Sequence, residues 1–136
     1  MYPTLHDGDC LLVKKTEHSA VRGTIVLLKL SSNQSPRSIA VKRIVAIGGD
    51  IVKIDYETNA VYVNGLILFE PYINYDQEDP MRQNGEPCTR TFVIPDGRVF
   101  LLGDNRNYSL DSRDEEMGLV SEKDIIGAVS IFLRLE

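Results

Sequence analysis

Hydrophobic side chains occur along this chain in short runs that are separated by clusters of Gly, Pro, Asn and Asp. Aliphatic and β-branched residues dominate the runs, which is typical of strands joined by tight turns. The clearest signal is the Asn64-Gly65 pair, because Asn-Gly readily adopts the positive φ angles of a two-residue hairpin turn. The pattern predicts strands at residues 10–14, 24–30, 38–47, 51–55, 60–63, 66–69, 91–94, 99–102 and 125–133.

Helix has little room in this pattern, and only residues 121–124 favour a helical turn, with Ser121 as its cap. The polar residues 31–37 are predicted to form a loop. Residues 70–90 are also polar and bury little apolar surface, so they predict a protruding loop or small flap. The sequence therefore predicts one mainly β domain over residues 1–136, with a polar flap at about 70–90.

Composition excludes several classes of function. With 15 basic and 20 acidic residues, the net charge of −5 argues against nucleic acid as a partner. The apolar runs are far shorter than the roughly 20 residues that cross a bilayer, and no targeting peptide is visible. Two cysteines and two histidines are too few for a structural zinc site, so we expect no metal and no cofactor. Cys10 and Cys88 could form a disulfide or remain buried free thiols, and the sequence leaves both open.

The densest polar segment is Gly103 to Arg113, reading GDNRNYSLDSR, which directly follows the apolar run 99–102. A strand that ends in a cluster of charges and hydroxyls can hold polar groups rigidly beside a reaction centre. An ordinary solvated turn with incidental salt bridges is the alternative. The length of the segment favours a functional site.

Lys42 lies in an otherwise apolar predicted strand, next to Arg43. A lysine among small aliphatic neighbours loses hydration, which lowers its pKa from about 10.4 and lets it accept a proton. Taken alone, the strand favours the alternative of an edge strand with the ammonium group in water.

The segment at 103–113 changes this balance, because it supplies acids that would keep Lys42 charged unless they are paired. Asp104 and Asp111 are expected to pair with Arg43 and Arg113 in a buried or half-buried ion network. Ser109 is expected to donate to or accept from the Lys42 amine and so to orient it. The residues thus predict a base held beside a rigid polar turn.

The same segment resembles, almost letter for letter, the GDNRxxSxDSR pattern of the type I signal peptidases, which are Ser/Lys proteases. Other stretches agree with that family in the same order, so that the resemblance covers nearly the whole chain. They are Met1 to Leu5 with Gly8-Asp9, Gly23-x-Ile25-Val26, Val41 to Val45 with Gly49-Asp50, and Val61 to Gly65. In the family the first stretch reads Ser-Met-x-Pro-Thr-Leu, and its serine is the nucleophile.

The resemblance implies a fold of coiled antiparallel sheets, shared with the self-cleaving repressors, and removal of signal peptides from secreted preproteins. Lys42 would match the general base and Ser109 its orienting hydroxyl. Asp111 and Arg113 would match a structural ion pair, supported by Arg43 and Asp104. The residues that would line the shallow substrate pockets are Met1, Leu5 and Val41.

By the same likeness, the protein would act at the cell membrane on the extracytoplasmic side of a bacterium. We expect the chain to be a soluble fragment that begins just after the nucleophilic serine, without its membrane anchor, and to be inactive as given. Apolar surface near Met1, Leu5 and Phe69 would rest on the membrane. Two alternatives are a self-cleaving repressor domain and a catalytically dead homologue that binds extended peptides by strand addition.

Overall fold

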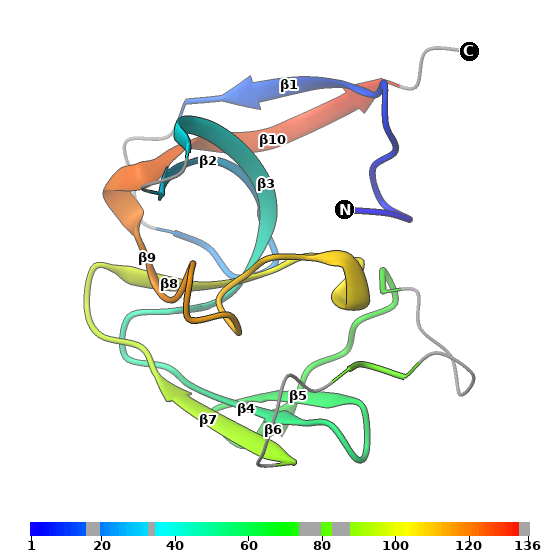
Figure 1. Ribbon diagram of the computed structural model, residues 1–136, viewed down its shortest axis with the longest axis vertical. Helices are drawn as coiled ribbons and strands as arrows, with labels where there is room; N and C mark the ends of the chain where they lie inside the picture. Colours follow the sequence, from blue (N-terminus) through cyan, green and yellow to red (C-terminus); the bar gives the residue numbers. More distant parts are fainter. Residues whose placement is uncertain (16–19, 33–34, 74–79, 83–87, 134–136) are drawn as a thin grey trace.

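The computed structural model describes residues 1–15, 20–32, 35–73, 80–82 and 88–133. Its strands form two antiparallel sheets, which confirms the prediction of a mainly β fold (Figure 1). The larger sheet is strongly curved and has the strand order β1-β10-β2-β3-β8-β9. Its strands are β1 (Cys10–Lys14), β2 (Ile25–Ser32), β3 (Ser35–Ile47), β8 (Arg98–Leu102), β9 (Val120–Ser121) and β10 (Ile125–Leu133).

The smaller sheet lies below the larger one in Figure 1 and has the order β6-β5-β4-β7. Its strands are β4 (Ile51–Asp55), β5 (Ala60–Val63), β6 (Leu66–Ile67) and β7 (Thr89–Val93). The predicted hairpin is present, since β5 pairs with β6 around Asn64 and Gly65, which both have positive φ. Ser121 caps the predicted helical turn, a 3-10 helix η2 (Glu122–Asp124), by accepting a hydrogen bond from the Lys123 amide.

Some predicted boundaries are wrong. The expected loop at 31–37 is mostly strand, because β2 continues to Ser32 and β3 begins at Ser35, while residues 33 and 34 lie outside the described part. The sequence also missed the two-residue strand β9 and the 3-10 helix η1 (Arg106–Tyr108). Both are too short to carry a periodic pattern, so only their packing reveals them.

Strands β3 and β8 separate two hydrophobic clusters. Val99 and Leu101 of β8 belong to one cluster, whereas Phe100 and Leu102 belong to the other. The register of β3 against β8 shifts between Ile44 and Ala46, which marks a β-bulge. Ile44 and Ala46 would share one face of a regular strand, but across the bulge Ile44 enters one cluster and Ala46 the other. Together the two strands form the rigid wall from which the polar segment after β8 emerges.

The described parts of the expected flap at 70–90 are more closely packed than the sequence indicates. Met81 is 3% exposed and belongs to the cluster between the sheets, and its amide donates to Asn59 Oδ1 at 2.8 Å. The Glu70 side chain is also buried. Residues 74–79 and 83–87 lie outside the described part. Met81 and the Glu70 side chain are thus packed into the fold, while the loop or small flap over the whole stretch stays a prediction.

Two further features concern the cysteines and the membrane. Cys10 and Cys88 are free and exposed, so of the two alternatives this structure has the free thiols, which are exposed rather than buried. Among the residues that the structure describes, no helix has the length and apolar character needed to traverse a bilayer.

Candidate active site

The end of strand β8 brings Lys42 and Ser109 together, although 67 positions separate them in the sequence. Arg43 of β3 pairs with Leu102 of β8, so the next pair in this antiparallel register places Lys42 beside Gly103. Lys42 Nζ donates a hydrogen bond to Ser109 Oγ at 3.0 Å. The chain reaches Ser109 through η1, which turns it back toward β3.

Gly103 makes this close approach possible. A Cβ atom at this position would lie 2.2 Å from Ser109 Oγ, 2.6 Å from Ser109 Cβ and 3.7 Å from Lys42 Nζ. Contacts of 2.2 and 2.6 Å are far shorter than the usual separation of nonbonded heavy atoms. Any side chain here would therefore displace Ser109.

We expect Gly103→Ala to break the Lys42–Ser109 hydrogen bond and to destabilise the fold by about 1–3 kcal/mol, as overpacking typically does. Urea denaturation measures the stability, and a crystal structure of the variant reports the bond. Adding Ser109→Gly removes both clashing atoms and should restore most of the stability. Unchanged stability and an intact bond in Gly103→Ala would contradict this reading of the site.

The surroundings of Lys42 favour its neutral form. Burial lowers the pKa of the Lys42 ammonium group below its ordinary value of 10.5, and this desolvation is the largest influence. The carboxylates of Asp111 and Asp114 raise the pKa, whereas the Arg113 guanidinium lowers it. A lysine with a lowered pKa has a larger neutral fraction near neutral pH, and only the neutral amine can accept a proton.

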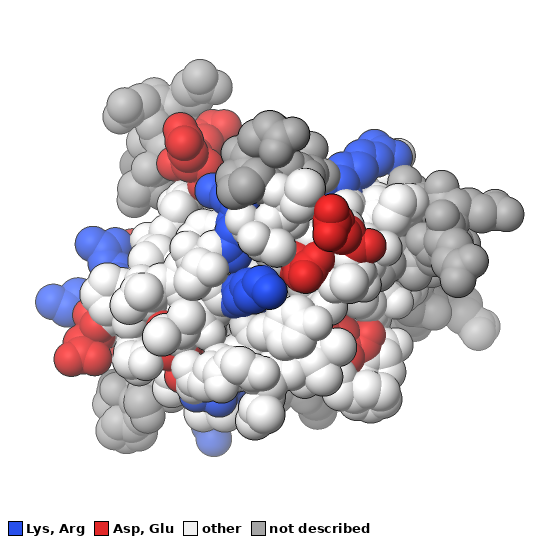
Figure 2. Space-filling model, turned by 90° about the horizontal axis from the view of Figure 1, so that it is seen from below, with Lys and Arg blue, Asp and Glu red and all other residues white. Residues whose placement is uncertain are grey.

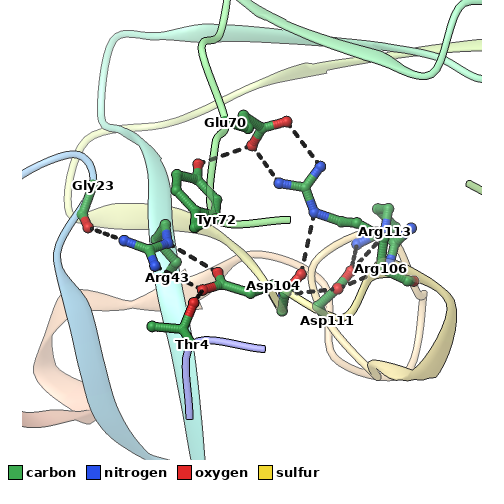
Figure 3. Close-up of polar contacts among 10 residues, drawn as sticks. Thr4, Gly23, Arg43, Glu70, Tyr72, Asp104, Arg106, Asp111 and Arg113 are labelled. Atoms are coloured by element: carbon green, nitrogen blue, oxygen red, sulfur yellow. Dashed lines mark hydrogen bonds and ion pairs between the residues drawn. The ribbon is translucent and has the colours of Figure 1, made fainter. Parts of the chain in front are cut away.

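Arg43 and Asp104 form a two-pronged ion pair next to Lys42 (Figure 3). Arg43 Nε donates to Asp104 Oδ1 at 2.9 Å, and Arg43 Nη2 donates to Oδ2 at 2.6 Å. Arg43 Nη1 also donates to the Gly23 carbonyl at 2.8 Å, and Thr4 Oγ1 donates to Asp104 Oδ2. The Arg43 guanidinium compensates the charge of the Asp104 carboxylate, which is 1% exposed. The hydrogen bond from Thr4 connects the start of the chain to this pair and so to β3.

Asp111 and Arg113 form a second ion pair, which holds the turn around Ser109. Arg113 Nε and Nη2 donate to the two carboxylate oxygens of Asp111 at 2.8 and 2.9 Å. Asp111 Oδ2 also accepts from the Gly103 amide at 3.1 Å, and Arg113 Nη2 donates to the Arg106 carbonyl. Asp111 is fully buried. The neighbouring Ser112 contributes by accepting the Leu101 amide at 2.9 Å.

The start of the chain lies near Lys42. The Met1 amino group is partly buried, and burial lowers its pKa, with a further lowering by the positive charge of Lys42. A charge effect of this kind requires the two groups to be close together. Met1, Leu5 and Val41 line a surface hollow of about 360 Å³, together with His6, Asp7, Asp9 and Leu11.

The expectation of exposed apolar surface at the start of the chain is wrong for Leu5, which is 8% exposed. Leu5 is buried in the fold rather than facing outward, although it also lines the hollow. Phe69, in contrast, is 85% exposed. The apolar surface therefore involves Phe69 but not Leu5.

Sequence reasoning missed several residues of this network. Arg106 lies inside the polar segment 103–113, so its position could have suggested a role. Glu70 and Tyr72 lie in the stretch that was predicted to be a solvated flap, and nothing local distinguishes them. In the sequence, Thr4 stands out only as part of the stretch Met1 to Leu5. Figure 3 shows these side chains converging with the two ion pairs.

A family model described as signal peptidase, peptidase S26, matches residues 1–133. With this match spanning almost its full length, the chain belongs to the signal peptidase family of serine-type peptidases. It is 34% identical to signal peptidase IB of Staphylococcus aureus strain COL, over 96% of this chain and 71% of that protein. It is 35% identical to signal peptidase I T of Bacillus subtilis strain 168, over 93% of this chain and 65% of that protein.

The fold has a counterpart among solved structures. A signal peptidase I from Enterococcus faecalis V583 superposes with a TM-score of 0.66 at 24% sequence identity, covering 85% of this chain and all of that chain. This likeness supports the mainly β architecture of antiparallel sheets. The resemblance read from the sequence motifs is thus confirmed at the level of family and fold.

Proposed function

We propose that this chain forms the catalytic part of a membrane-associated endopeptidase that removes signal peptides from secreted preproteins through a Ser/Lys dyad. The observation that carries the proposal is the half-buried Lys42 amine, which is bonded to Ser109 at 3.0 Å and lies near the Met1 amino group. In the family pattern the nucleophilic serine directly precedes the residue matched by Met1. A serine hydroxyl at that position would be within reach of the Lys42 base.

In the proposed reaction, the serine Oγ attacks the carbonyl carbon of the scissile peptide bond and gives its proton to Lys42 Nζ. Lys42 passes that proton to the leaving amine nitrogen as the C–N bond breaks, which leaves an acyl-enzyme ester. Lys42 then takes a proton from a water molecule whose oxygen attacks the ester. The proton returns to the serine Oγ as the carboxylic acid product leaves.

Ser109 has an orienting role in this scheme. By accepting one N–H of Lys42, the Ser109 hydroxyl fixes the direction of the nitrogen lone pair, which must point at the nucleophile. The two ion pairs keep Asp104 and Asp111 engaged with Arg43 and Arg113, so that neither acid holds the Lys42 proton tightly. Ser109 thus orients the Lys42 amine, and the two ion pairs help to keep that amine neutral.

The proposed partners are extended signal peptides at a membrane surface. The hollow lined by Met1 and Val41 is shallow enough to favour small side chains beside the scissile bond. Figure 2 shows a face with scattered charges and much uncharged surface. The small sheet exposes apolar side chains that are suited to contact with lipid, together with the neighbouring Phe69. In the sheet these side chains are Ile51, Leu66, Ile67 and Val93.

The test adds a serine directly before Met1 and measures cleavage of a synthetic preprotein peptide with a small residue before the scissile bond. We expect cleavage by the serine-bearing chain and none by the chain as given or by a matched chain with alanine added instead. A peptide with a bulky residue before the scissile bond should resist cleavage.

Two outcomes would contradict the proposal. If the serine-bearing chain binds the peptide without cutting it, the chain is a peptide-binding homologue rather than an enzyme. If the alanine-bearing chain cuts as fast as the serine-bearing chain, the nucleophile lies elsewhere.

A further inference from the structure

Glu70 connects the two ion pairs of the site (Figure 3). Its Oε1 accepts a hydrogen bond from the Tyr72 hydroxyl at 2.9 Å and also pairs with Arg106 Nη2. Its Oε2 accepts from Arg106 Nη1 at 3.0 Å. The side chains of Glu70 and Arg106 are 4% and 1% exposed. Both carboxylate oxygens are therefore used, in a place that water hardly reaches.

One branch from Glu70 leads to the Ser109 side of the site. Arg106, held by Glu70, donates from Nε to the Gly103 carbonyl at 3.1 Å. Gly103 is the residue whose position sets the contact between Ser109 and Lys42. The Arg106 carbonyl in turn accepts from Arg113, which pairs with Asp111.

The other branch leads to the nucleophile side. The Arg43 guanidinium lies over the Tyr72 ring, with Arg43 Cζ 3.8 Å from the ring centroid, a cation–π contact. Arg43 holds Asp104, and Asp104 accepts from Thr4 near the start of the chain. Glu70 thus touches both branches, through Arg106 on one side and Tyr72 on the other.

We propose that Glu70 is a positioning residue for the Lys42–Ser109 pair, acting through Arg106 and Gly103 on one side and through Tyr72 and Arg43 on the other. The proposal rests on the proposed function in that its kinetic test needs an active enzyme. Stability alone does not explain the arrangement, because a buried ion pair is often no more stable than apolar residues of the same size. Its value lies in fixing directions, which charged and bidentate contacts do well.

The described residues 80–82 contact the same short helix, next to Arg106. Asn107 Oδ1 accepts from the Arg82 amide at 2.8 Å, and Asn107 Nδ2 donates to the Pro80 carbonyl at 3.0 Å. Glu70 and residues 80–82 thus bind consecutive residues of η1, Arg106 and Asn107. Both contacts restrain the turn that leads to Ser109.

The test compares Glu70→Gln and Tyr72→Phe with Asp50→Asn, all in the chain with the added serine. Asp50 is a matched control, since its carboxylate is 5% exposed and is paired with Arg22, but its hydrogen bonds go to Arg22, Ile47 and Asn64. We expect Glu70→Gln to lower kcat by about 10²-fold with KM unchanged, because misplacement of catalytic groups has effects of this size. Tyr72→Phe removes only one hydroxyl and should lower kcat by about tenfold or less.

In the double variant Glu70→Gln/Tyr72→Phe, the two losses should not multiply, since both substitutions break the same link. Crystal structures provide a readout that does not depend on activity. The Lys42–Ser109 hydrogen bond should be lost in Glu70→Gln and kept in Asp50→Asn.

The proposal is overturned if Glu70→Gln keeps the Lys42–Ser109 bond, or if its kcat falls no further than that of Asp50→Asn. A rise in KM with unchanged kcat would assign Glu70 to substrate binding and would equally overturn it. If the serine-bearing parent does not cleave at all, the proposed function fails, and the crystal structures alone decide the role of Glu70. Should Glu70→Gln fail to fold, the milder Tyr72→Phe carries the same comparison.

Discussion

Replacing Lys42 by methionine in the serine-bearing chain is expected to reduce cleavage of a signal peptide by about 10³-fold or more. Methionine has a similar length but no group that can take the proton of the attacking hydroxyl. Ser109 cannot substitute, because a neutral hydroxyl is a far weaker base than an amine. Single-turnover kinetics with a fluorogenic peptide would measure the loss.

Stability provides the control for Lys42→Met. The pKa of Lys42 is lowered in the fold by burial, so between that value and its unfolded value the unfolded chain binds more protons and stability rises with pH. Near neutral pH the lysine therefore reduces stability, and Lys42→Met should unfold at the same or a higher temperature than its parent. Cleavage within tenfold of the parent in a folded variant would rule out Lys42 as the base.

Because Lys42 must be neutral to act as a base, kcat/KM should decrease on the acid side of its pH profile. Below the pKa of Lys42 the amine becomes protonated and can no longer accept a proton, so kcat/KM should fall by about tenfold per pH unit. Since burial moves this pKa down from 10.5, the acid limb of the profile should lie below pH 10.5. A profile that stays flat down to pH 5 would exclude an amine as the base.

Asp111→Asn is expected to destabilise the fold by about 3–5 kcal/mol, which is typical when one partner of a buried ion pair is removed. The amide keeps the shape but not the charge, so the Arg113 guanidinium, whose side chain is 8% exposed, is left without its counterion. The Asp111 oxygen that accepts from the Gly103 amide is also weakened as an acceptor. Urea denaturation followed by circular dichroism would measure the change.

A double variant supplies the matched control for Asp111→Asn. Asp111→Asn/Arg113→Met removes both charges and should recover a large part of the lost stability, because no uncompensated charge stays buried. A single variant that costs less than about 1 kcal/mol would show that the pair is solvated rather than structural.

Much of the sheet structure could be predicted from the sequence because its signals are local. The Asn64-Gly65 turn specifies a hairpin by itself, and the strands at 10–14, 51–55, 60–63 and 125–133 have the predicted bounds. The sequence predicts that the third strand begins at Ser38, because the residues before it are polar. In the structure they are strand, since pairing with β2 compensates for weak intrinsic preference.

The site was predictable where its residues lie in short motifs, as in the segment 103–113 and at the Lys42-Arg43 pair. Asp104, Ser109, Asp111 and Arg113 lie within a few positions of one another, so their proximity needs no tertiary information. Glu70 lies 36 positions from Arg106, in a polar stretch typical of exposed loops. Its burial depends on the packing of two sheets, which a pattern of polar and apolar positions does not report.

The position of the site depends on how strand β8 packs against the two hydrophobic clusters. Alternate side chains of β8 enter two separate clusters, and Gly103 follows directly after it. A substitution on either side that raises or lowers this strand by a fraction of an ångström would be transmitted to Lys42, the proposed base. Under the proposed function, evolution of either core would be constrained by catalysis, even at positions that never meet a substrate.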